Sequence, residues 1–172
     1  RDWRRFWRIG LTYRSEDGAM RVNAEQVVQS WDMTFKDTKR ADYVVGQVWA
    51  RRGAEVFLLD QVRDRMEFTE ACRAVERLSA KWPQAHLKLV EDKANGPAVI
   101  SQLRRHVPGL VAVEARDSKE ARASAVAPFV EAGNVYLPVA AVAPWINDYI
   151  EEHIFFPHGA HDDQVDATSQ AL

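Results

Sequence analysis

Residues 27–33 (VVQSWDM) combine β-branched and aromatic hydrophobic positions with polar ones and lead into a polar, charged turn, which is typical of a β-strand. Because successive side chains of a strand point to opposite faces, Val28, Ser30 and Asp32 share one face and Trp31 lies on the other. A carboxylate at the exit of a central strand is poorly solvated unless a counter-ion, a metal ion or a helix terminus lies beside it. Asp32 is therefore the first candidate for a functional residue.

Two further strands follow, over residues 43–50 and 55–62. Residues 51–54 (RRGA) have the composition of a hairpin turn between them. Three strands connected this closely predict an antiparallel meander. The preceding residues 1–23 mix aromatic and aliphatic residues with arginines, which is typical either of an extended arm or of an edge strand.

Beyond the meander, stretches with the helical period alternate with short strands. Helices are predicted over residues 66–82, from 96 to Pro108, over 118–132 and 145–153, and from residue 161 onward. Strands are predicted between them at residues 86–90, 110–113 and 135–137. This order predicts an α/β fold in which helices flank a mixed central sheet. The first and fourth strands can be neighbours in such a sheet, which would bring Asp32 and Glu91 together at their ends.

The chain of 172 residues suits one domain, and its 47% hydrophobic and 28% charged residues are typical of a soluble globular protein. The lone Cys72 excludes an internal disulfide and, on the apolar face of a predicted helix, is expected in the core. No apolar run approaches the roughly 20 residues of a membrane span, so no membrane partner is expected. Because the sequence lacks an initiator methionine and stops within a predicted helix, we expect a domain of a longer protein.

The net charge of −2 does not by itself indicate nucleic-acid binding. Basic residues nevertheless gather in several places: Arg1, Arg4, Arg5, Arg8, Lys36, Lys39, Arg40, Arg51, Arg52, Arg104 and Arg105. If the acids are concentrated in one pocket, the remaining surface is more basic than the net charge, which permits a polyanionic substrate. Arg51, Arg52 and Lys36 are the candidate DNA contacts, and we expect Arg51 and Arg52 beside the cleft.

Acidic residues recur at three element boundaries: at Asp32, at Glu91 and Asp92, and at Asp162 and Asp163. Hydrolysis of a phosphodiester needs an attacking water, neutralisation of charge at phosphorus and a stabilised leaving oxygen. Two Mg²⁺ or Mn²⁺ ions roughly 4 Å apart supply all three. Because such ions prefer oxygen ligands, these carboxylates predict a two-metal nuclease site.

Each of these acids also has a simpler interpretation. Asp162 and Asp163 suit the N-terminus of a helix as capping residues. Glu91 or Asp92 alone would more often be a solvated residue at the end of a strand. Asp42 is typical of an ordinary turn acid, although its position before the second strand could orient the site.

Three further residues are candidates to surround and orient the ligands. His161 could contact a metal ligand or be an ordinary loop histidine. Lys93 could neutralise developing charge or lie on the surface. Asp166 follows Asp162 and Asp163 at helical spacing and would share their side of the last helix.

Three strings resemble the nuclease motifs of the large terminase subunits of tailed bacteriophages. They are residues 29–37 (QSWDMTFKD) with the Asp and Tyr at 42–43, residues 90–97 (VEDKANGP) and residues 161–167 (HDDQVDA). Residues 119–122 (KEAR) and 131–138 (EAGNVYLP) are similar to further strings of that family. The resemblance runs from residue 29 to the end of the chain, and several motifs in order are more specific than any one.

The resemblance implies an RNase H-like fold and an endonuclease with two Mg²⁺ or Mn²⁺ ions. Such an enzyme cleaves concatemeric double-stranded viral DNA during packaging, in the host cytoplasm at the procapsid. By position in the motifs, Asp32 would bridge the metals, Glu91 would be the second acid, and Asp162 or Asp163 would be the third. Asp92 would replace Glu91 if the strand were one residue longer.

One departure from the family is the absence of a phosphate-binding Gly-x-x-x-x-Gly-Lys-Ser/Thr loop. We therefore expect this domain, residues 1–172, to cut DNA without pumping it. The partners implied are an N-terminal ATPase domain of the same protein, the portal and the small terminase subunit.

Two other functions remain open on the sequence. One is another RNase H-like nuclease, of the junction resolvase or transposase type, against which the strings at 119–138 argue. The other is a non-catalytic module that docks on the portal or DNA, whose function would survive the loss of Asp32.

Overall fold

A single sheet organises the computed structural model, which describes residues 3–9, 12–15, 20–22, 24–33, 43–93 and 95–172. Within these residues the strand order is β3-β2-β1-β9-β6-β5-β4-β7-β8. The strands are β1 (Arg4–Ile9), β2 (Thr12–Ser15), β3 (Met20–Val22), β4 (Gln26–Asp32), β5 (Val44–Arg52), β6 (Glu55–Asp64), β7 (Ala85–Glu91), β8 (Leu110–Val113) and β9 (Val135–Pro138). The helices are α1 (Phe68–Lys81), α2 (Gly96–Leu103), α3 (Lys119–Glu131), α4 (Ile146–Phe155) and α5 (Asp163–Ala171).

The predicted fold class is confirmed. β4, β5 and β6 form the antiparallel meander, whereas β4 pairs in parallel with β7, β7 with β8, and β6 with β9. The neighbourhood predicted for the first and fourth strands of the sequence analysis is therefore present, as β4 beside β7. The two lie side by side because α1 crosses over between the end of β6 and the start of β7.

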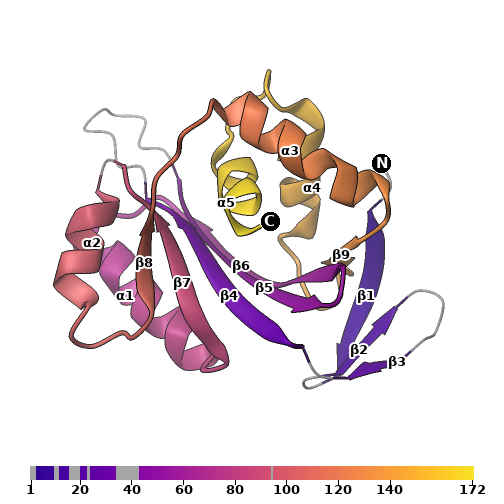
Figure 1. Cartoon of the computed structure of the whole chain (residues 1–172), viewed down its shortest axis with the longest axis horizontal. Helices are drawn as coiled ribbons and strands as arrows, with labels where there is room; N and C mark the ends of the chain where they lie inside the picture. The colour runs from indigo at the N-terminus through magenta and orange to yellow at the C-terminus, as the bar shows by residue number, and fades with distance from the viewer. Residues whose placement is uncertain (1–2, 10–11, 16–19, 23, 34–42, 94) are drawn as a thin grey trace.

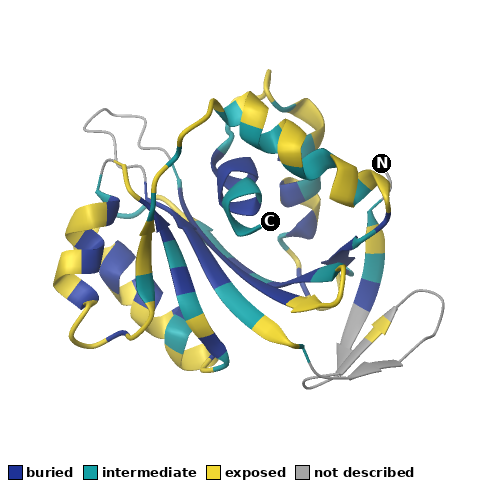
Figure 2. Ribbon diagram, viewed as in Figure 1, coloured by how far each residue is buried: buried dark blue, intermediate teal, exposed yellow. Residues whose placement is uncertain are grey.

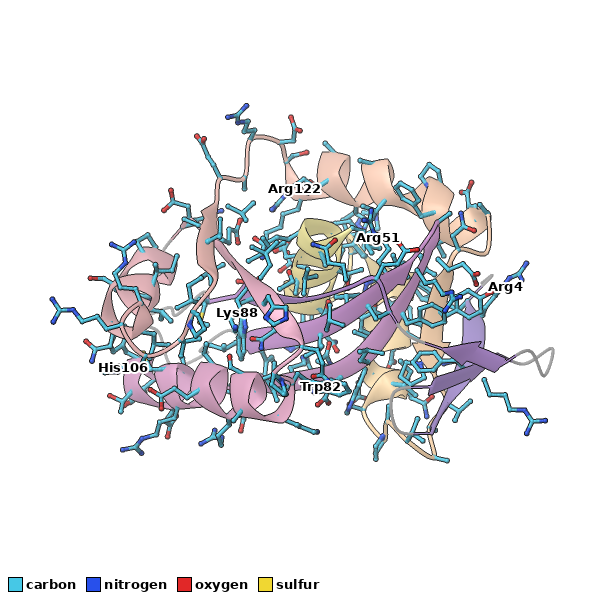
Figure 3. All side chains as sticks on the ribbon, turned by 60° about the horizontal axis from the view of Figure 1, so that its bottom comes forward. Arg4, Arg51, Trp82, Lys88, His106 and Arg122 are labelled. Carbon is cyan, nitrogen blue, oxygen red and sulfur yellow. The ribbon has the colours of Figure 1, made fainter. Side chains whose placement is uncertain are left out.

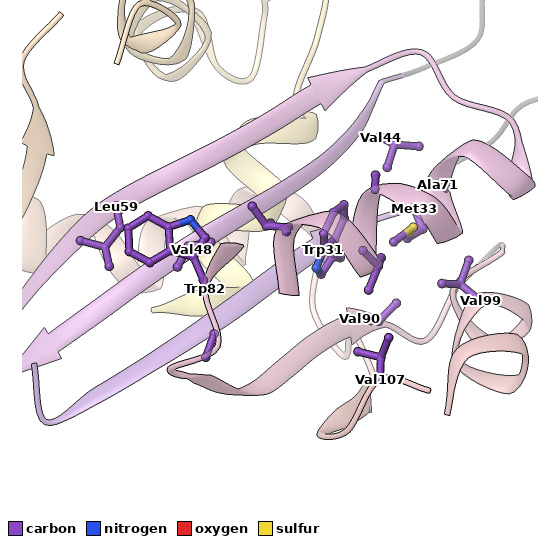
Figure 4. Close-up of a cluster of buried hydrophobic side chains, with 14 of the residues drawn as sticks. Trp31, Met33, Val44, Val48, Leu59, Ala71, Trp82, Val90, Val99 and Val107 are labelled. Atoms are coloured by element: carbon purple, nitrogen blue, oxygen red, sulfur yellow. The ribbon is translucent and has the colours of Figure 1, made fainter. Parts of the chain in front are cut away.

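Helices cover both faces of this sheet, with α1 and α2 on one side and α3, α4 and α5 on the other (Figure 1). On the first side Trp31 is fully buried among residues of β5, β7 and α1, including Val44, Val90 and Ala71 (Figure 4). Gly46, which pairs with Trp31 across β4 and β5, makes room for its ring: a Cβ there would lie 2.4 Å from the indole. The face predicted for Trp31 is thus the apolar one.

The opposite side holds a second core and a buried polar layer. Its apolar part consists of Trp49, Leu58, Val135, Leu137, Ala143, Ile146 and Tyr149. Between β5, β6 and α5 lie amide side chains: Gln47 donates to Gln61 over 3.0 Å, and Gln61 donates to Gln164 over 2.8 Å. Figure 2 shows that α5 is buried between the sheet and the surface helix α3.

Several boundaries differ from the sequence prediction. The second and third strands extend through Arg52 and to Asp64, so the turn shrinks to Gly53 and Ala54. α4 continues to Phe155, two residues beyond its predicted end at residue 153. Of the two interpretations of the first residues, the strand is the better one, since β1 pairs with both β2 and β9. No helix in the described part of the chain has the length and apolar character needed to cross a membrane.

Candidate active site

Two carboxylates stand at the ends of neighbouring central strands. Asp32 is the last residue of β4 and Glu91 the last residue of β7, and the two strands run parallel. Both residues are buried, with 2% and 6% of their surface exposed. Because the carboxyl ends of parallel neighbours meet at one edge of a sheet, the fold brings these acids to the same place.

The turn after β7 holds Glu91 tightly. Lys93 donates its backbone N–H to the Glu91 carbonyl over 2.8 Å, and Gly96 donates to the Lys93 carbonyl over 3.1 Å. A Cβ at Gly96 would lie 2.0 Å from the Glu91 carbonyl oxygen, so only glycine permits this return of the chain. Asp92 and Lys93 themselves are exposed.

Helix α5 contributes the remaining acids. Asp163 and Asp166 are 4% and 3% exposed, whereas the side chain of Asp162 is 42% exposed. The helix lies across both strands: the Ser30 hydroxyl donates to the Ala167 carbonyl over 2.6 Å, and the Gln170 amide donates to the Leu89 carbonyl of β7 over 3.3 Å. These bonds fix α5 across β4 and β7, two residues before the strand ends that carry Asp32 and Glu91.

Two cations of α3 lie among the acids. Lys119 forms ion pairs with Asp162 (2.9 Å) and Asp166 (2.5 Å). Arg122, labelled in Figure 3, reaches Glu91 with one guanidinium nitrogen and Asp166 with another, each at 3.4 Å. Arg122 therefore links the end of β7 to α5.

Burial and ion pairing have opposite effects on the pKa values in this cluster. Burial raises the pKa of the Asp166 carboxyl above its ordinary value, and the hydrogen bond and charge of Lys119 offset this only in part. Burial alone would lower the pKa of Lys119, but its bonds to Asp166 and Asp162 outweigh burial and raise it. The lysine is accordingly a firmly charged partner of the carboxylates.

The donor set fits a hard divalent cation, since every acidic ligand candidate offers oxygen and Mg²⁺ and Mn²⁺ prefer oxygen. As the described side chains stand, no three Asp, Glu, His or Cys residues lie close enough together to share one ion. Instead Lys119 and Arg122 bridge the acids. A metal ion at these carboxylates would therefore replace at least one of the contacts made by α3.

Comparison with known sequences identifies the family of this domain. The profile of the terminase RNase H-like domain matches residues 29–172, which is most of the chain. The chain belongs to this family. No curated protein matches its sequence.

Solved structures of terminase nucleases share the fold. The large terminase nuclease of the thermophilic phage G20c with bound zinc has a TM-score of 0.66 at 18% identity, over 98% of this chain and 91% of that one. The nuclease domain of the bacteriophage SPP1 large terminase with bound Mn has a TM-score of 0.61 at 13% identity, over 87% and 86%. The large terminase of another thermophilic bacteriophage, in complex with ADP, has a TM-score of 0.62 at 11% identity, over 86% of this chain but 39% of that one.

The structure buries most of the acids singled out in the sequence. Asp32, Glu91, Asp163 and Asp166 are buried, Arg122 joins Glu91 to Asp166, and Lys119 joins Asp166 to Asp162. Their roles as metal ligands remain predictions. Asp162 occupies the N-cap position of α5, but its side chain makes no capping hydrogen bond. The interpretation of Asp162 as a helix-capping residue therefore does not describe it.

Other candidates are placed elsewhere. Arg51 pairs with Gln26 at the start of β4, so Arg51 and Arg52 lie away from the acidic cluster, and their contact with DNA stays a prediction. Six residues of extended strand, about 20 Å, separate them from Asp32. His161 packs its ring edge-on against Tyr43, with the centroids 5.1 Å apart. Lys36 and Asp42 lie outside the described residues.

Sequence reasoning missed the position of Lys119 and Arg122 within the site. Both belong to the KEAR string that resembles the terminase family, and their spacing of three puts them on one face of a helix after the Ser118 cap. This shared face was the signal in the sequence that two cations act together. Which residues they contact depends on the packing of α3 over α5, which the sequence pattern does not give.

Proposed function

We propose that this terminase domain is a divalent-metal-dependent endonuclease that cleaves concatemeric double-stranded viral DNA during genome packaging by a two-metal mechanism. The observation that carries the proposal is the burial of Asp32, Glu91, Asp163 and Asp166, with Arg122 bridging Glu91 to Asp166 and Lys119 bound to Asp166. A surface that only gripped DNA would gain nothing from buried carboxylates, because they repel phosphate and are costly to desolvate.

We assign the ligand roles by how deeply each carboxylate is buried and by whether a cation of α3 already binds it. Asp32 and Glu91 would hold the ions from the strand ends. Asp163 is preferred to Asp162 as the third acid, because Asp162 is the more exposed and is bound by Lys119. Two bound Mg²⁺ or Mn²⁺ ions would activate water, neutralise charge at phosphorus and stabilise the leaving oxygen. G20c, SPP1 and related nucleases solved with zinc, magnesium or Mn support such ions here.

The two cations of α3 would act on the DNA rather than on the ions. An ammonium and a guanidinium that pair with carboxylates in the protein can equally donate to phosphate oxygens. Once metal ions neutralise the acids, Lys119 and Arg122 are free to bind the scissile phosphate and its neighbour. Contacts to phosphate position a duplex without reading its bases, so little sequence preference is expected.

The setting of the reaction follows from the family. We propose that the domain works joined to an ATPase domain, as part of a large terminase that meets the portal and the small terminase subunit at the procapsid in the host cytoplasm. The relative solved with ADP, of which this chain spans 39%, is a large terminase. Arg51 and Arg52, remote from the acids, would contact DNA phosphates only outside the cleavage site.

Cleavage of supercoiled plasmid tests the proposal. The purified domain is incubated with Mg²⁺, with Mn²⁺ and with chelator, alongside Asp32→Asn and a control, Asp92→Asn, which removes a carboxylate from an exposed position in the turn after β7. We expect metal-dependent nicking and linearisation that fall at least about 1000-fold in Asp32→Asn, as for loss of a group that acts on the reacting atoms. Asp92→Asn is expected to stay within about threefold of wild type.

Either of two results would contradict this proposal. Cleavage that persists in Asp32→Asn would mean that the site lies elsewhere. A domain that binds duplex DNA but does not cleave it with either metal, alone or fused to an ATPase domain, would favour a docking module.

A further inference from the structure

The N-terminus of α5 is capped from another helix. The first amides of a helix have no acceptor within it, and the residue at the N-cap usually supplies one. Here the Asp162 side chain is bound to Lys119 instead. Glu152 of α4 takes its place: Oε1 accepts the backbone N–H of Gln164 over 2.6 Å and that of Val165 over 3.1 Å.

Glu152 is a buried acid whose oxygens are fully engaged. It is 8% exposed, and Oε2 accepts the side-chain amide of Gln164 over 2.5 Å with the Arg63 guanidinium 3.7 Å away. Burying a carboxylate is costly unless donors and positive charge surround it. Three N–H donors, Arg63 and the positive end of α5 meet that requirement.

The segment that Glu152 holds is the one that carries the acids. Gln164 and Val165 lie between Asp163 and Asp166 in the first turn of α5. A shift or rotation of this turn would therefore move both carboxylates together, relative to Asp32 and Glu91 on the sheet. The network of Gln47 and Gln61 fixes the other side of Gln164 but leaves the amides of the turn to Glu152.

We propose that Glu152 is a positioning residue of the metal site: it fixes the first turn of α5 and thereby holds Asp163, the third ligand of the proposed site, together with its neighbour Asp166. This inference rests on the proposed nuclease function. Glu152 is not itself a ligand, because both of its oxygens bind donors of α5. It acts on the ions through the backbone that carries the acids.

The test compares Glu152→Gln and Glu152→Ala with wild type and with Glu151→Gln, which removes the same charge from the neighbouring, exposed position of α4. Mn²⁺ affinity is measured by calorimetry, the Mn²⁺ concentration for half-maximal plasmid cleavage is measured separately, and hydrogen exchange of the Gln164 and Val165 amides reports the turn. All measurements are made well below the melting temperature of each variant.

We expect Mn²⁺ binding to weaken at least about 10-fold in Glu152→Ala, the usual cost of losing a group that orients a ligand. Glu152→Gln retains one acceptor oxygen and should lose only about threefold. The half-maximal Mn²⁺ concentration should rise by the same factors, while cleavage at saturating Mn²⁺ changes less. Exchange of the two amides should accelerate in the same order, and Glu151→Gln should match wild type.

Three results would overturn the inference. If both Glu152 variants melt at lower temperature but bind Mn²⁺ as wild type does, the residue only stabilises the fold. If Gln and Ala variants weaken binding equally, and Glu151→Gln does so too, the effect is one of net charge. If the wild-type domain itself neither binds Mn²⁺ nor cleaves DNA, the proposed nuclease function fails together with this inference. In the first two results the wild-type domain is active and only the role of Glu152 fails.

Discussion

The two helices that bring charged side chains to the acidic site are attached to the protein in opposite ways. In α5 the whole run of residues 163–168 is buried, and hydrogen bonds tie it to β4, β5, β6 and α4. In α3, all of which the structure describes, no residue is buried. The N-terminal half of α3 is attached by the ion pairs of Lys119 and Arg122. Pro128 has no N–H, so the helix lacks one of its backbone hydrogen bonds there.

The difference matches the roles proposed for the two helices. Carboxylates that are to hold two ions need fixed positions, and a helix inside the protein provides them. Cations that are to exchange acids for phosphate need to move, and a helix on the outside can do so at small cost. The contrast predicts that equal changes in the two helices have unequal consequences.

The largest effect is expected for Gln164→Ala in α5. The Gln164 side chain accepts from Gln61 and donates to Glu152, so its loss leaves a buried donor and a carboxylate oxygen with one fewer partner and opens a small cavity. We expect the free energy of unfolding in urea to fall by about 3 kcal/mol. The same substitution at Gln102, exposed on α2, should cost under about 0.5 kcal/mol. Equal losses at both sites would mean that the polar layer under α5 contributes little.

The second prediction concerns the loss of stability at low pH, and it tests α4, the helix that carries Glu152 against α5. His153 of α4 packs against Tyr149 and Trp3, and burial lowers its pKa from 6.5 to about 4, although its bond to the Tyr149 carbonyl partly offsets this. A histidine with a depressed folded-state pKa favours the folded state above pH 6.5, and this contribution is lost as the pH falls toward 4. Between about pH 8 and pH 5 the loss should be about 2 kcal/mol.

Urea unfolding at several pH values measures this loss. His153→Phe should flatten the dependence between about pH 8 and pH 5, because no proton is then taken up on unfolding at this position. His158→Phe, in the exposed loop after α4, serves as the matched control and should keep the wild-type slope. A slope that survives in His153→Phe would assign the acid sensitivity to other groups.

The sequence predicted the parts of this site that depend on local pattern. β-Branched and aromatic residues identified the strand that ends at Asp32, and the short strand predicted at residues 86–90 leads directly to Glu91, so their meeting followed once the strands were neighbours. The antiparallel meander also excludes Arg51 from the site, because the end of β5 pairs with the start of β4.

The parts that depend on packing between distant elements could not be read from the pattern. Glu152 is one acid among several on α4, and only the approach of α5 makes it a cap. Lys119 and Arg122 have the spacing of any exposed helical pair until α3 is laid over α5. Helix amphipathicity gives no guidance for α3, since none of its residues is buried.

The smallest effect is expected for Lys119→Met in α3, and it tests whether that helix can move away from the acids beneath it. The variant leaves Asp166, which is 3% exposed, without the ammonium that binds it. Breaking a fully buried pair costs several kcal/mol, but the Lys119 side chain is 35% exposed, so a small movement of α3 would admit water to Asp166. We therefore expect the free energy of unfolding in chelator to fall by only about 1 kcal/mol.

Two further variants serve as controls. Asp166→Asn combined with Lys119→Met should restore most of the lost free energy, and Lys93→Met, at an exposed loop lysine, should change nothing measurable. A loss of about 3 kcal/mol or more that Asp166→Asn does not relieve would show that α3 is held as rigidly as α5, and the contrast between the two helices would fail.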